Sequence, residues 1–376
     1  MTAKRAGKTV VVKVGSSTLT TESGTFRLSA VGALVAEVCE LHAAGHRMVV
    51  VSSGAVSAGM GALALKQRPT EVVDLQATAA IGQGRLFQTY NGLFAQEKVA
   101  AAQVLLTAFD VAARTQYLNA RNTLNRLLDW GVVPIVNEND TTSVDELCFG
   151  DNDTLAAQVA LLVKADLLVL LTDTDGLFTA DPCVDRGARL IPRVEDPGEL
   201  SRVEIGATGP LGSGGMGSKV NSARIATSGG VETVIARGGR TDVIKEVLAG
   251  KDVGTRFCPR SRGLPDYKLW LLYGKPARGR VYVDDGALRA LRGSGSLLPV
   301  GVVGVEGDFV GGDAVLVVGQ DGTELAKGLV SYSKIDLERV KGMHTSEVAS
   351  LMPQASPEAI HRDYMVLIDE RTQEEH

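Results

Sequence analysis

Two polar clusters within residues 132–157 contain the residue types best suited to chemistry in this chain. Residues 137–140 (NEND) follow a short apolar run, and residues 150–153 (GDND) begin thirteen positions later. Amide and carboxylate groups in loops beyond the ends of parallel strands are well placed to bind small polar ligands. Helix capping explains one such cluster, because Asp and Asn are favoured at helix starts. Capping does not explain two clusters at this spacing.

Two lysines stand next to glycine-containing turns. Lys13 interrupts the apolar run TVVVKV and is followed by Gly15, and Lys219 ends the glycine-rich segment GSGGMGSK at residues 212–219. A buried lysine is costly unless it is paired, meets an anion or extends to the sheet edge, and these alternatives are open for Lys13. A glycine-rich loop that leads into a helix exposes backbone N–H groups and is suited to holding phosphate.

The glycine-rich segment matches neither of two well-known nucleotide motifs. It contains GxGxxG, but the dinucleotide fingerprint follows an apolar strand, whereas EIGATGPLGSGG is a loop-like sequence. In a Walker A loop the lysine directly follows a glycine, whereas here Ser218 lies between Gly217 and Lys219. A second glycine turn, VSSGA at residues 51–55, also joins an apolar run to a helical pattern. Taken alone, this turn is a weak indication of an anion site.

Together these motifs favour phosphoryl transfer. Two lysines, the glycine turns and the carboxylate of Asp153 are expected at one edge of a sheet, and phosphoryl transfer depends mainly on positioning and charge neutralisation. None of the five histidines falls in the motifs, which disfavours Ser/His hydrolysis. A carboxylate acceptor is already ionised near neutral pH and needs no general base. The absence of a histidine from the motifs is therefore consistent with a carboxylate acceptor.

The elements that would position these motifs alternate along the first 250 residues. A helix is expected between the first two strands, with Ser29 as its N-cap and Gly45 as its end. The alternation predicts an α/β fold with a mainly parallel sheet covered by helices on both faces. The predicted strands are the apolar runs at residues 9–14, 48–51, 99–106, 132–136, 167–171 and 231–236.

The sequence pattern changes near residue 278. Short β-rich runs at residues 281–283, 300–305, 314–318 and 325–330 are separated by glycine-containing turns, which predicts a small all-β barrel. Three prolines mark residues 259–277 as a linker. The expected organisation is a catalytic domain at 1–258, the linker at 259–277, the barrel at 278–360 and a C-terminal strand and tail at 361–376.

Composition limits the classes of function. The chain has 376 residues, of which 44% are hydrophobic, and its net charge of −5 provides no basic field for nucleic acid or an anionic membrane. Residues 1–8 lack an apolar segment, and no run of 18 apolar residues occurs, so neither secretion nor membrane spanning is expected. The four cysteines lie far apart, at Cys39, Cys148, Cys183 and Cys258, so neither a metal site nor a disulfide framework is expected. A cytoplasmic location is expected for the same reason.

Six motifs resemble those of glutamate 5-kinases in the amino-acid kinase family. They are KVGSS, VSSGAV, NEND, GDND, LTDTDGLFTADP and GGMGSK, and the resemblance covers nearly the whole chain, with a C-terminal module similar to a PUA domain. It implies a three-layer α/β/α fold with a mainly parallel sheet. It also implies transfer of the γ-phosphoryl group of ATP, carried with Mg²⁺, to the side-chain carboxylate of L-glutamate, which is the first step of proline synthesis.

The resemblance also implies roles for individual residues. Lys13 and Lys219 would hold the transferring phosphoryl group, and Asp153 would orient the two lysines. Three residues match glutamate-binding positions: Ser53, Asn152 and Asp140, of which Asp140 is a suitable partner for an α-ammonium group. The positions that match nucleotide binding are Lys13, Thr172, Asp173, Ser213, Gly214, Gly215, Met216, Gly217, Ser218 and Lys219.

Two alternative functions stay open. A sibling kinase that acts on N-acetylglutamate, aspartate or a nucleoside monophosphate would use the same phosphate machinery, and only the acceptor pocket would differ. A nucleotide sensor without turnover could instead bind RNA through its barrel. Residues 278–376 contain 10 Lys or Arg and 16 Asp or Glu, however, so RNA binding is not expected. We also expect a homo-oligomer, with proline as a candidate feedback inhibitor.

Overall fold

The computed structural model describes residues 7–21, 25, 27–142, 152–195, 215–259, 264–293 and 295–368. Contacts divide the chain into two compact units, Met1–Leu264 and Pro265–His376. This division differs from the linker expected at 259–277, because residues 265–274 belong to the second unit and form α10 (Asp266–Leu269) and a π-helix (Trp270–Gly274). Trp270 and Leu271 are buried there, which explains why this apolar stretch is not a free connector.

The first unit is built on an eight-stranded sheet in the order β3-β4-β2-β1-β5-β7-β8-β6. All neighbouring strands are parallel except β7 and β8, which are antiparallel. Each of the six predicted strands is present, and the described part of this sheet contains two further short strands that were not predicted, β6 and β8. The strands are β1 (Thr9–Val14), β2 (Arg47–Ser52), β3 (Ala101–Leu106), β4 (Val133–Glu138), β5 (Leu167–Thr172), β6 (Arg193–Val194), β7 (Glu232–Arg237) and β8 (Thr255–Phe257).

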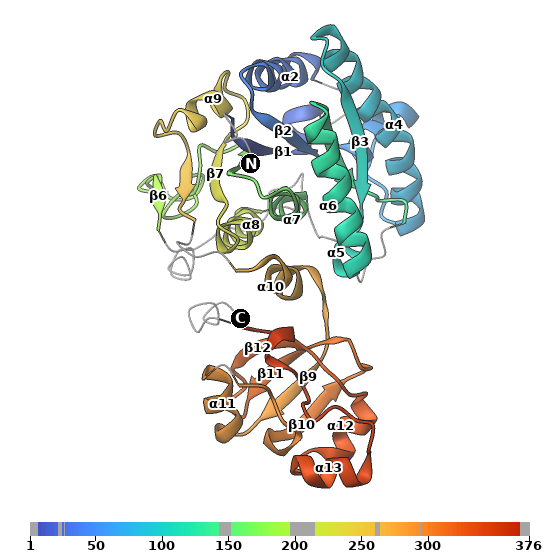
Figure 1. The fold of residues 1–376 in the computed structure, drawn as a ribbon. Helices are drawn as coiled ribbons and strands as arrows, with labels where there is room; N and C mark the ends of the chain where they lie inside the picture. The colour runs from blue at the N-terminus through green and yellow to red at the C-terminus, as the bar shows by residue number, and fades with distance from the viewer. Residues whose placement is uncertain are drawn as a thin grey trace. The chain divides into compact units, whose positions relative to one another are not determined.

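Helices cover both faces of this sheet (Figure 1). One layer contains α2 (Leu28–Ala43), α4 (Val72–Gln96) and α9 (Val243–Leu248), and the other contains α6 (Arg114–Asp129), α7 (Asn152–Val163) and α8 (Met216–Ser228). The three-layer fold is therefore confirmed. Shorter helices connect the strands at the sheet edge: α1 (Ser16–Leu19), α3 (Ala55–Leu63) and α5 (Ala108–Ala112).

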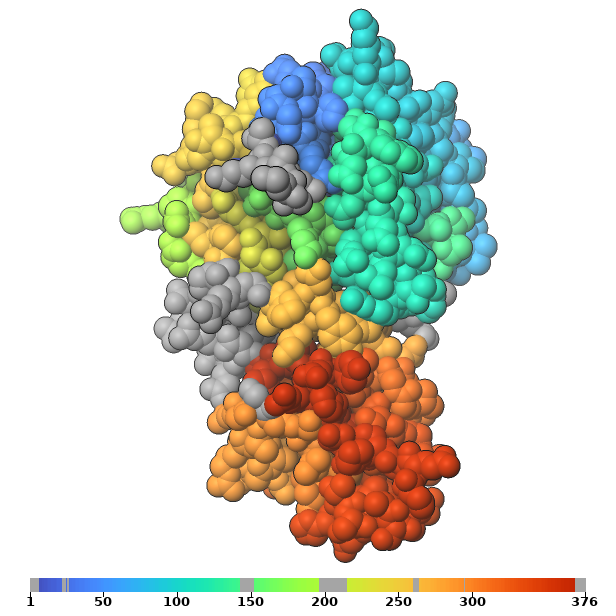
Figure 2. Space-filling model, viewed as in Figure 1, coloured from blue at the N-terminus to red at the C-terminus, as the bar shows by residue number. Residues whose placement is uncertain are grey.

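The two helix layers differ in how deeply their members are buried. Helix α7 is buried at Asp153 and at every residue from Leu155 to Val163, since it lies against the central strands and between α6 and α8. Helix α6 instead buries only a stripe that includes Tyr117, Leu124 and Leu128. Its polar side forms part of the outer surface of this unit, in teal-green in the space-filling view (Figure 2). The polar residues that begin α7 are therefore in the interior.

The start of α2 differs from the prediction. The helix begins at Leu28 with Arg27 as its N-cap, so Ser29 lies inside its first turn. The backbone N–H of Arg27 donates to the carbonyl of Leu19, and this contact with α1 sets the entry of the chain in place of a side-chain cap. Gly45 ends the helix as predicted, because it adopts φ +92°, a left-handed conformation that favours glycine.

The second unit contains a five-stranded sheet in the order β10-β9-β11-β12-β13. Strands β9 and β11 are parallel and the other pairs are antiparallel. The expected C-terminal strand is present as β13 and pairs with β12. The strands are β9 (Ala277–Val283), β10 (Val302–Gly307), β11 (Ala314–Gly319), β12 (Glu324–Leu329) and β13 (Met365–Leu367).

An all-β barrel was predicted for this unit, but the unit contains helices as well as strands. It also contains α11 (Asp285–Arg292), α12 (Lys334–Val340) and α13 (Thr345–Leu351). Leu291, Leu337 and Val348 from these three helices join the hydrophobic core of the sheet. The helices are short, of seven or eight residues, and each places few residues in the core.

Candidate active site

The motif residues of the first unit gather at the carboxyl ends of its central parallel strands. Lys13 lies near the end of β1, in register with Val51 of β2 on one side and Leu170 of β5 on the other. Val10, Val12 and Val14 pack in the core with α2, α4 and α9. Successive side chains of a strand point to opposite faces, so Lys13 points to the other face, where α7 contacts β1.

Asp153 connects the two lysines. Its Oδ1 lies 2.6 Å from Nζ of Lys13, and its Oδ2 accepts a hydrogen bond from Nζ of Lys219 at 3.0 Å. Asp153 is fully buried in the first turn of α7, and both lysines are at least 94% buried. Among the described side chains, two ammonium groups and the carboxylate that they share sum to one positive charge in a nearly dry site. Such a site favours an anion with more than one charge, because buried charges need partners.

A second group of polar residues lies beside this carboxylate. Nδ2 of Asn152 lies 2.9 Å from Oγ of Ser53, 2.9 Å from Oδ1 of Asn137 and 3.2 Å from the carbonyl oxygen of Ser52. Gly54 turns the chain after Ser53 with φ +101°, a conformation that favours glycine, and α3 begins at the next residue. The predicted substrate residues Ser53 and Asn152 are therefore in direct contact.

Asp140 lies in the turn after β4. Burial is the main cause that raises its pKa to about 6, and the charge of Glu138 adds to the effect, whereas Arg68 opposes it. The described residues show no hydrogen bond between Asp140 and either Ser53 or Asn152. The structure thus brings Ser53 and Asn152 together. The third predicted substrate residue, Asp140, lies two residues after the end of β4, the strand next to β2 in the sheet.

The predicted nucleotide residues come from β5 and from the start of α8. Thr172 ends β5, and its hydroxyl donates to Oδ1 of Asp173 at 3.0 Å. The N–H of Gly238, which follows β7, donates to the carbonyl of Thr172 at 2.7 Å. Helix α8 begins at Met216, so the end of the glycine segment is its first turn. Ser213 and Gly214 lie outside the described residues.

Four further residues of this site were absent from the predicted set. The side chains of Ser52 and Tyr90 share a buried hydrogen bond at 3.1 Å, and Nδ2 of Asn137 donates to Oε1 of Gln83 at 2.7 Å. Ser52 and Asn137 stand inside the VSSGA and NEND motifs, which could have indicated them. Gln83 and Tyr90 lie on α4, where single polar residues in a long helix give no signal.

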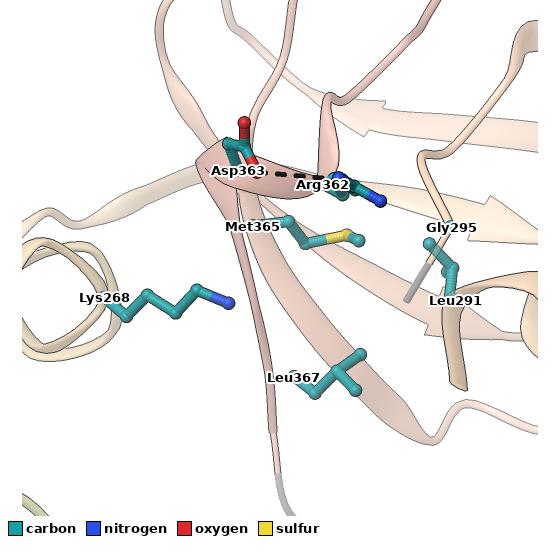
Figure 3. A pocket seen from close by; sticks show the side chains of 7 residues that line it. All are labelled: Lys268, Leu291, Gly295, Arg362, Asp363, Met365 and Leu367. Carbon is teal, nitrogen blue, oxygen red and sulfur yellow. Dashed lines mark ion pairs between the residues drawn. The ribbon is translucent and has the colours of Figure 1, made fainter. Parts of the chain in front are cut away.

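A hollow of about 240 Å³ lies in the second unit, lined by residues from several of its elements (Figure 3). Lys268 extends toward the strand that carries Met365, and Arg362 forms an ion pair with Asp363. The remaining lining residues are Leu291, Gly295 and Leu367. None of these residues belongs to the motifs for phosphate or acceptor binding.

Two kinds of feature are absent from the described residues. Within the ranges that the structure describes, no helix is long and apolar enough to cross a membrane. In the same ranges, no group of three or more His, Cys, Asp or Glu side chains is arranged to hold a metal ion.

Comparison with known proteins identifies the family. Residues 8–237 match the model of the amino acid kinase family, and residues 279–352 match that of the PUA domain. The chain belongs to the amino acid kinase family. Among family members, the glutamate 5-kinase of Nostoc punctiforme is 46% identical over 96% of this chain and 100% of its own length. The glutamate 5-kinase of Carboxydothermus hydrogenoformans is 47% identical over 96% and 97% of the two chains.

A solved structure supports the fold of this amino acid kinase. The UMP kinase of Bacillus anthracis aligns with 68% of the chain and 97% of its own length, with a TM-score of 0.50 and 16% identity. At this identity the likeness concerns the fold alone. The resemblance to glutamate 5-kinases that the motifs indicated is confirmed by the full-length relatives, and the C-terminal PUA module is confirmed by its family model.

Proposed function

We propose that this chain transfers the γ-phosphoryl group of ATP to the side-chain carboxylate of L-glutamate, the first step of proline synthesis. The observation that carries the proposal is the buried Asp153 carboxylate with Lys13 and Lys219 on its two oxygens. This arrangement fixes two cations where an anion with several charges can bind. The glutamate 5-kinases that match over nearly their full length support glutamate as the acceptor.

In the proposed reaction, one oxygen of the glutamate side-chain carboxylate attacks the γ-phosphorus of ATP. The bond from this phosphorus to the oxygen that bridges it to ADP breaks, and its electron pair stays on ADP. The products are L-glutamyl 5-phosphate and ADP, and no proton has to be removed from the acceptor. Lys13 and Lys219 neutralise charge on the phosphoryl group as it moves, and Asp153 keeps both ammonium groups in place.

Mg²⁺ is proposed to enter with ATP, bound to its phosphates, and to neutralise part of their charge. Both oxygens of Asp153 face lysine ammonium groups, so this carboxylate is not disposed as a metal ligand. The donor groups of the site therefore fit a metal that the nucleotide carries.

We propose that the acceptor binds to Ser53, Asn152 and Asp140. Ser53 and Asn152 are 2.9 Å apart beyond β2, next to the lysine pair at Asp153. The Asp140 carboxylate is suited to an α-ammonium group, which an N-acetylated substrate lacks. We propose further that ATP contacts Lys13, Thr172, Asp173 and the segment from Ser213 through Gly214, Gly215, Met216, Gly217 and Ser218 to Lys219.

The direct test is a panel of acceptors with ATP and Mg²⁺. Release of ADP and trapping of the acyl phosphate as hydroxamate would be measured with L-glutamate, aspartate, N-acetylglutamate and nucleoside monophosphates. We expect L-glutamate to have the highest kcat/KM. A higher value for any other acceptor would refute the assignment of glutamate and would favour a sibling kinase.

Lysine variants test the phosphoryl-binding role. Lys13→Met and Lys219→Met should each lower kcat about 10²-fold or more, the usual loss when a group that stabilises developing charge is removed. The matched control is Lys251→Met, because Lys251 is exposed and pairs with Glu246 on the surface of the same unit. Folded variants that change only KM for ATP would show that the lysines bind substrate and transition state equally.

We also propose that the second unit does not contribute to catalysis and instead regulates or organises the enzyme. All predicted site residues belong to Met1–Leu264. A protein that ends at Leu264 should phosphorylate glutamate if it folds, and a folded but inactive truncation would refute this. The acidic balance of residues 278–376 argues against RNA binding, and salt-dependent RNA binding by the second unit would contradict that expectation.

A cytoplasmic location is proposed from the thiols and the substrates. Cys39, Cys183 and Cys258 are free cysteines in the structure, as a reducing compartment requires. Fractionation of cells followed by immunodetection would test it.

A further inference from the structure

Gln83 is placed to control the orientation of the amide groups in the acceptor site. It lies half-buried on α4, and its Oε1 accepts a hydrogen bond from Nδ2 of Asn137 at 2.7 Å. The neighbouring Gly82 anchors this part of α4, because a Cβ atom there would lie 1.8 Å from the carbonyl oxygen of Ala55 in α3. Gln83 therefore extends from a backbone that is held closely against the helix following Ser53.

The direction of each amide in this group follows from one backbone atom. The carbonyl oxygen of Ser52 can only accept, so Asn152 must turn its Nδ2 toward it. The group on Asn137 that faces the same Nδ2 must then be its oxygen. Nδ2 of Asn137 consequently faces Gln83 and needs an acceptor there. Gln83 supplies that acceptor, and the chain of amides has a single direction from Ser52 outward.

This direction leaves one acceptor without a partner. Oδ1 of Asn152 is buried and, among the described residues, has no hydrogen-bond partner. A buried oxygen without a donor is costly, and the cost is recovered when a ligand supplies an N–H group. The proposed acceptor substrate carries an ammonium group with three such donors. Asn137 can keep this oxygen available only while its own amide is held by Gln83.

We infer that Gln83 is a positioning residue for acceptor selectivity: through Asn137, it holds the Asn152 amide with its oxygen toward the ammonium group of the substrate. The inference rests on the proposed function and extends it to a residue on a separate helix that does not touch the phosphoryl group. It predicts that loss of the Gln83 acceptor weakens recognition of the ammonium group and leaves phosphoryl transfer itself unchanged.

Replacement of Gln83 by Met tests this, since Met has a similar length and its thioether sulfur is only a weak acceptor for the bond from Asn137. Asn137 is 98% buried, so its Nδ2 would be left without a strong acceptor unless the amide turned over. A turned amide would set Nδ2 of Asn137 against Nδ2 of Asn152, donor against donor. Gln83→Glu keeps an acceptor oxygen and is the rescue variant. Gln88→Met is the matched control, because Gln88 is exposed on the same helix.

The measurements are kcat, KM for L-glutamate, KM for ATP and inhibition by glutarate, which has both carboxylates of glutamate and no ammonium group. In Gln83→Met we expect KM for glutamate to rise about tenfold, as for loss of one buried hydrogen bond. Values of kcat, KM for ATP and the glutarate inhibition constant should change less than about twofold. Gln83→Glu should restore most of the affinity for glutamate, and Gln88→Met should match the unaltered protein.

The outcomes separate this inference from the proposed function. If the unaltered protein does not phosphorylate glutamate, the proposed function is refuted and the inference is refuted with it. If the unaltered protein is active, three results overturn the inference alone. They are an unchanged KM for glutamate in Gln83→Met, an equal loss of affinity for glutamate and glutarate, and a fall in kcat without a rise in KM.

Discussion

Replacement of Asp153 by Asn should separate the two effects of the shared carboxylate. The substitution keeps the shape of the side chain and removes one negative charge that lies 2.6 Å from Lys13 and 3.0 Å from Lys219. All three side chains are buried, so water does not replace the lost charge at low cost. The variant therefore contains two buried ammonium groups next to a neutral amide.

The size of the effect follows from these distances. With an effective dielectric constant near 20, each of the two attractions amounts to about 6 kcal/mol before the cost of desolvation. Removal of one partner from a buried ion pair typically lowers stability by about 3 to 5 kcal/mol. For a unit of this size, a loss of about 3 kcal/mol lowers Tm by about 6 to 12 °C. We therefore expect the Tm of the first unit to be about 6 to 12 °C lower in Asp153→Asn than in the unaltered protein.

Nucleotide binding and catalysis should respond in opposite directions. The excess positive charge of the site rises by one in Asp153→Asn, so the protein should bind ADP or ATP more tightly and gain more thermal stability from either. The lysines are no longer held at the spacing that the transferring group requires, so kcat should fall about 10²-fold or more. A generally damaged protein would lose both properties together.

Thermal unfolding, nucleotide titration and the coupled kinase assay measure these quantities. Asp175→Asn is the control for stability, because Asp175 forms an exposed ion pair with Arg237 and should change stability by less than about 0.5 kcal/mol. Adding Lys219→Met to Asp153→Asn removes one of the two repelling cations and should recover part of the lost stability. If Asp153→Asn unfolds within about 2 °C of the unaltered protein, the carboxylate does not hold the lysines as described.

Three further predictions concern other residues. Burial raises the pKa of Asp140 to about 6, so the ionised form that we propose as the partner of the ammonium group is lost as pH falls below 6. The kcat/KM for glutamate should then fall about tenfold per pH unit, and a profile flat down to pH 5 would contradict this. Burial lowers the pKa of Lys327 from 10.5 to about 8, and its Nζ donates to the carbonyl of Leu272. The unfolded chain therefore binds more protons than the folded chain between pH 8 and 10.5. Across that window the free energy of unfolding, measured with urea, should rise by up to about 3 kcal/mol relative to that of Lys327→Met. The same pH dependence in both proteins would refute this. Gly82→Ala places a Cβ atom 1.8 Å from the carbonyl oxygen of Ala55, so it should lower Tm and raise KM for glutamate, whereas unchanged kinetics would show that α3 and α4 separate easily.

The central part of the fold was predictable because its signals are local. Buried parallel strands are continuous apolar runs, and Lys13 was conspicuous because it interrupts such a run. Asp153 was predictable as an acidic residue at a helix start next to a second polar cluster. The contact of Asp153 with both lysines was implied only by family resemblance, because spacing along the chain does not determine which elements meet.

Short elements and long-range partners were not predictable in this way. Strands β6 and β8 have two and three residues, too few to form a recognisable sequence pattern, so only the pairing of β8 with β6 and β7 defines them. Gln83 contacts a residue 54 positions away, and nothing in its own helix indicates this. For α11, by contrast, a usable signal was present, because Asp284 accepts a hydrogen bond from the N–H of Ala287 as an ordinary N-cap.

The place of β1 in the middle of the sheet has a consequence for how the chain folds as it is synthesised. Thr9–Val14 precedes every other strand of the described residues, and all six of its residues are buried in the finished protein. One neighbour, β2, follows soon, but the other is β5, where Val10 pairs with Leu167. At about 5 to 20 residues per second, β1 waits on the order of ten to thirty seconds for this partner.

During that interval β1 presents an unpaired apolar edge to other chains. The half-sheet of β2, β4 and β3 can form on one side of it, since these strands precede β5 in the chain. The lysine of β1 reaches its carboxylate only after α7 has been made, just ahead of β5. Slowing of synthesis between β4 and β5 should therefore increase aggregation of nascent chains, whereas slowing after β7 should not.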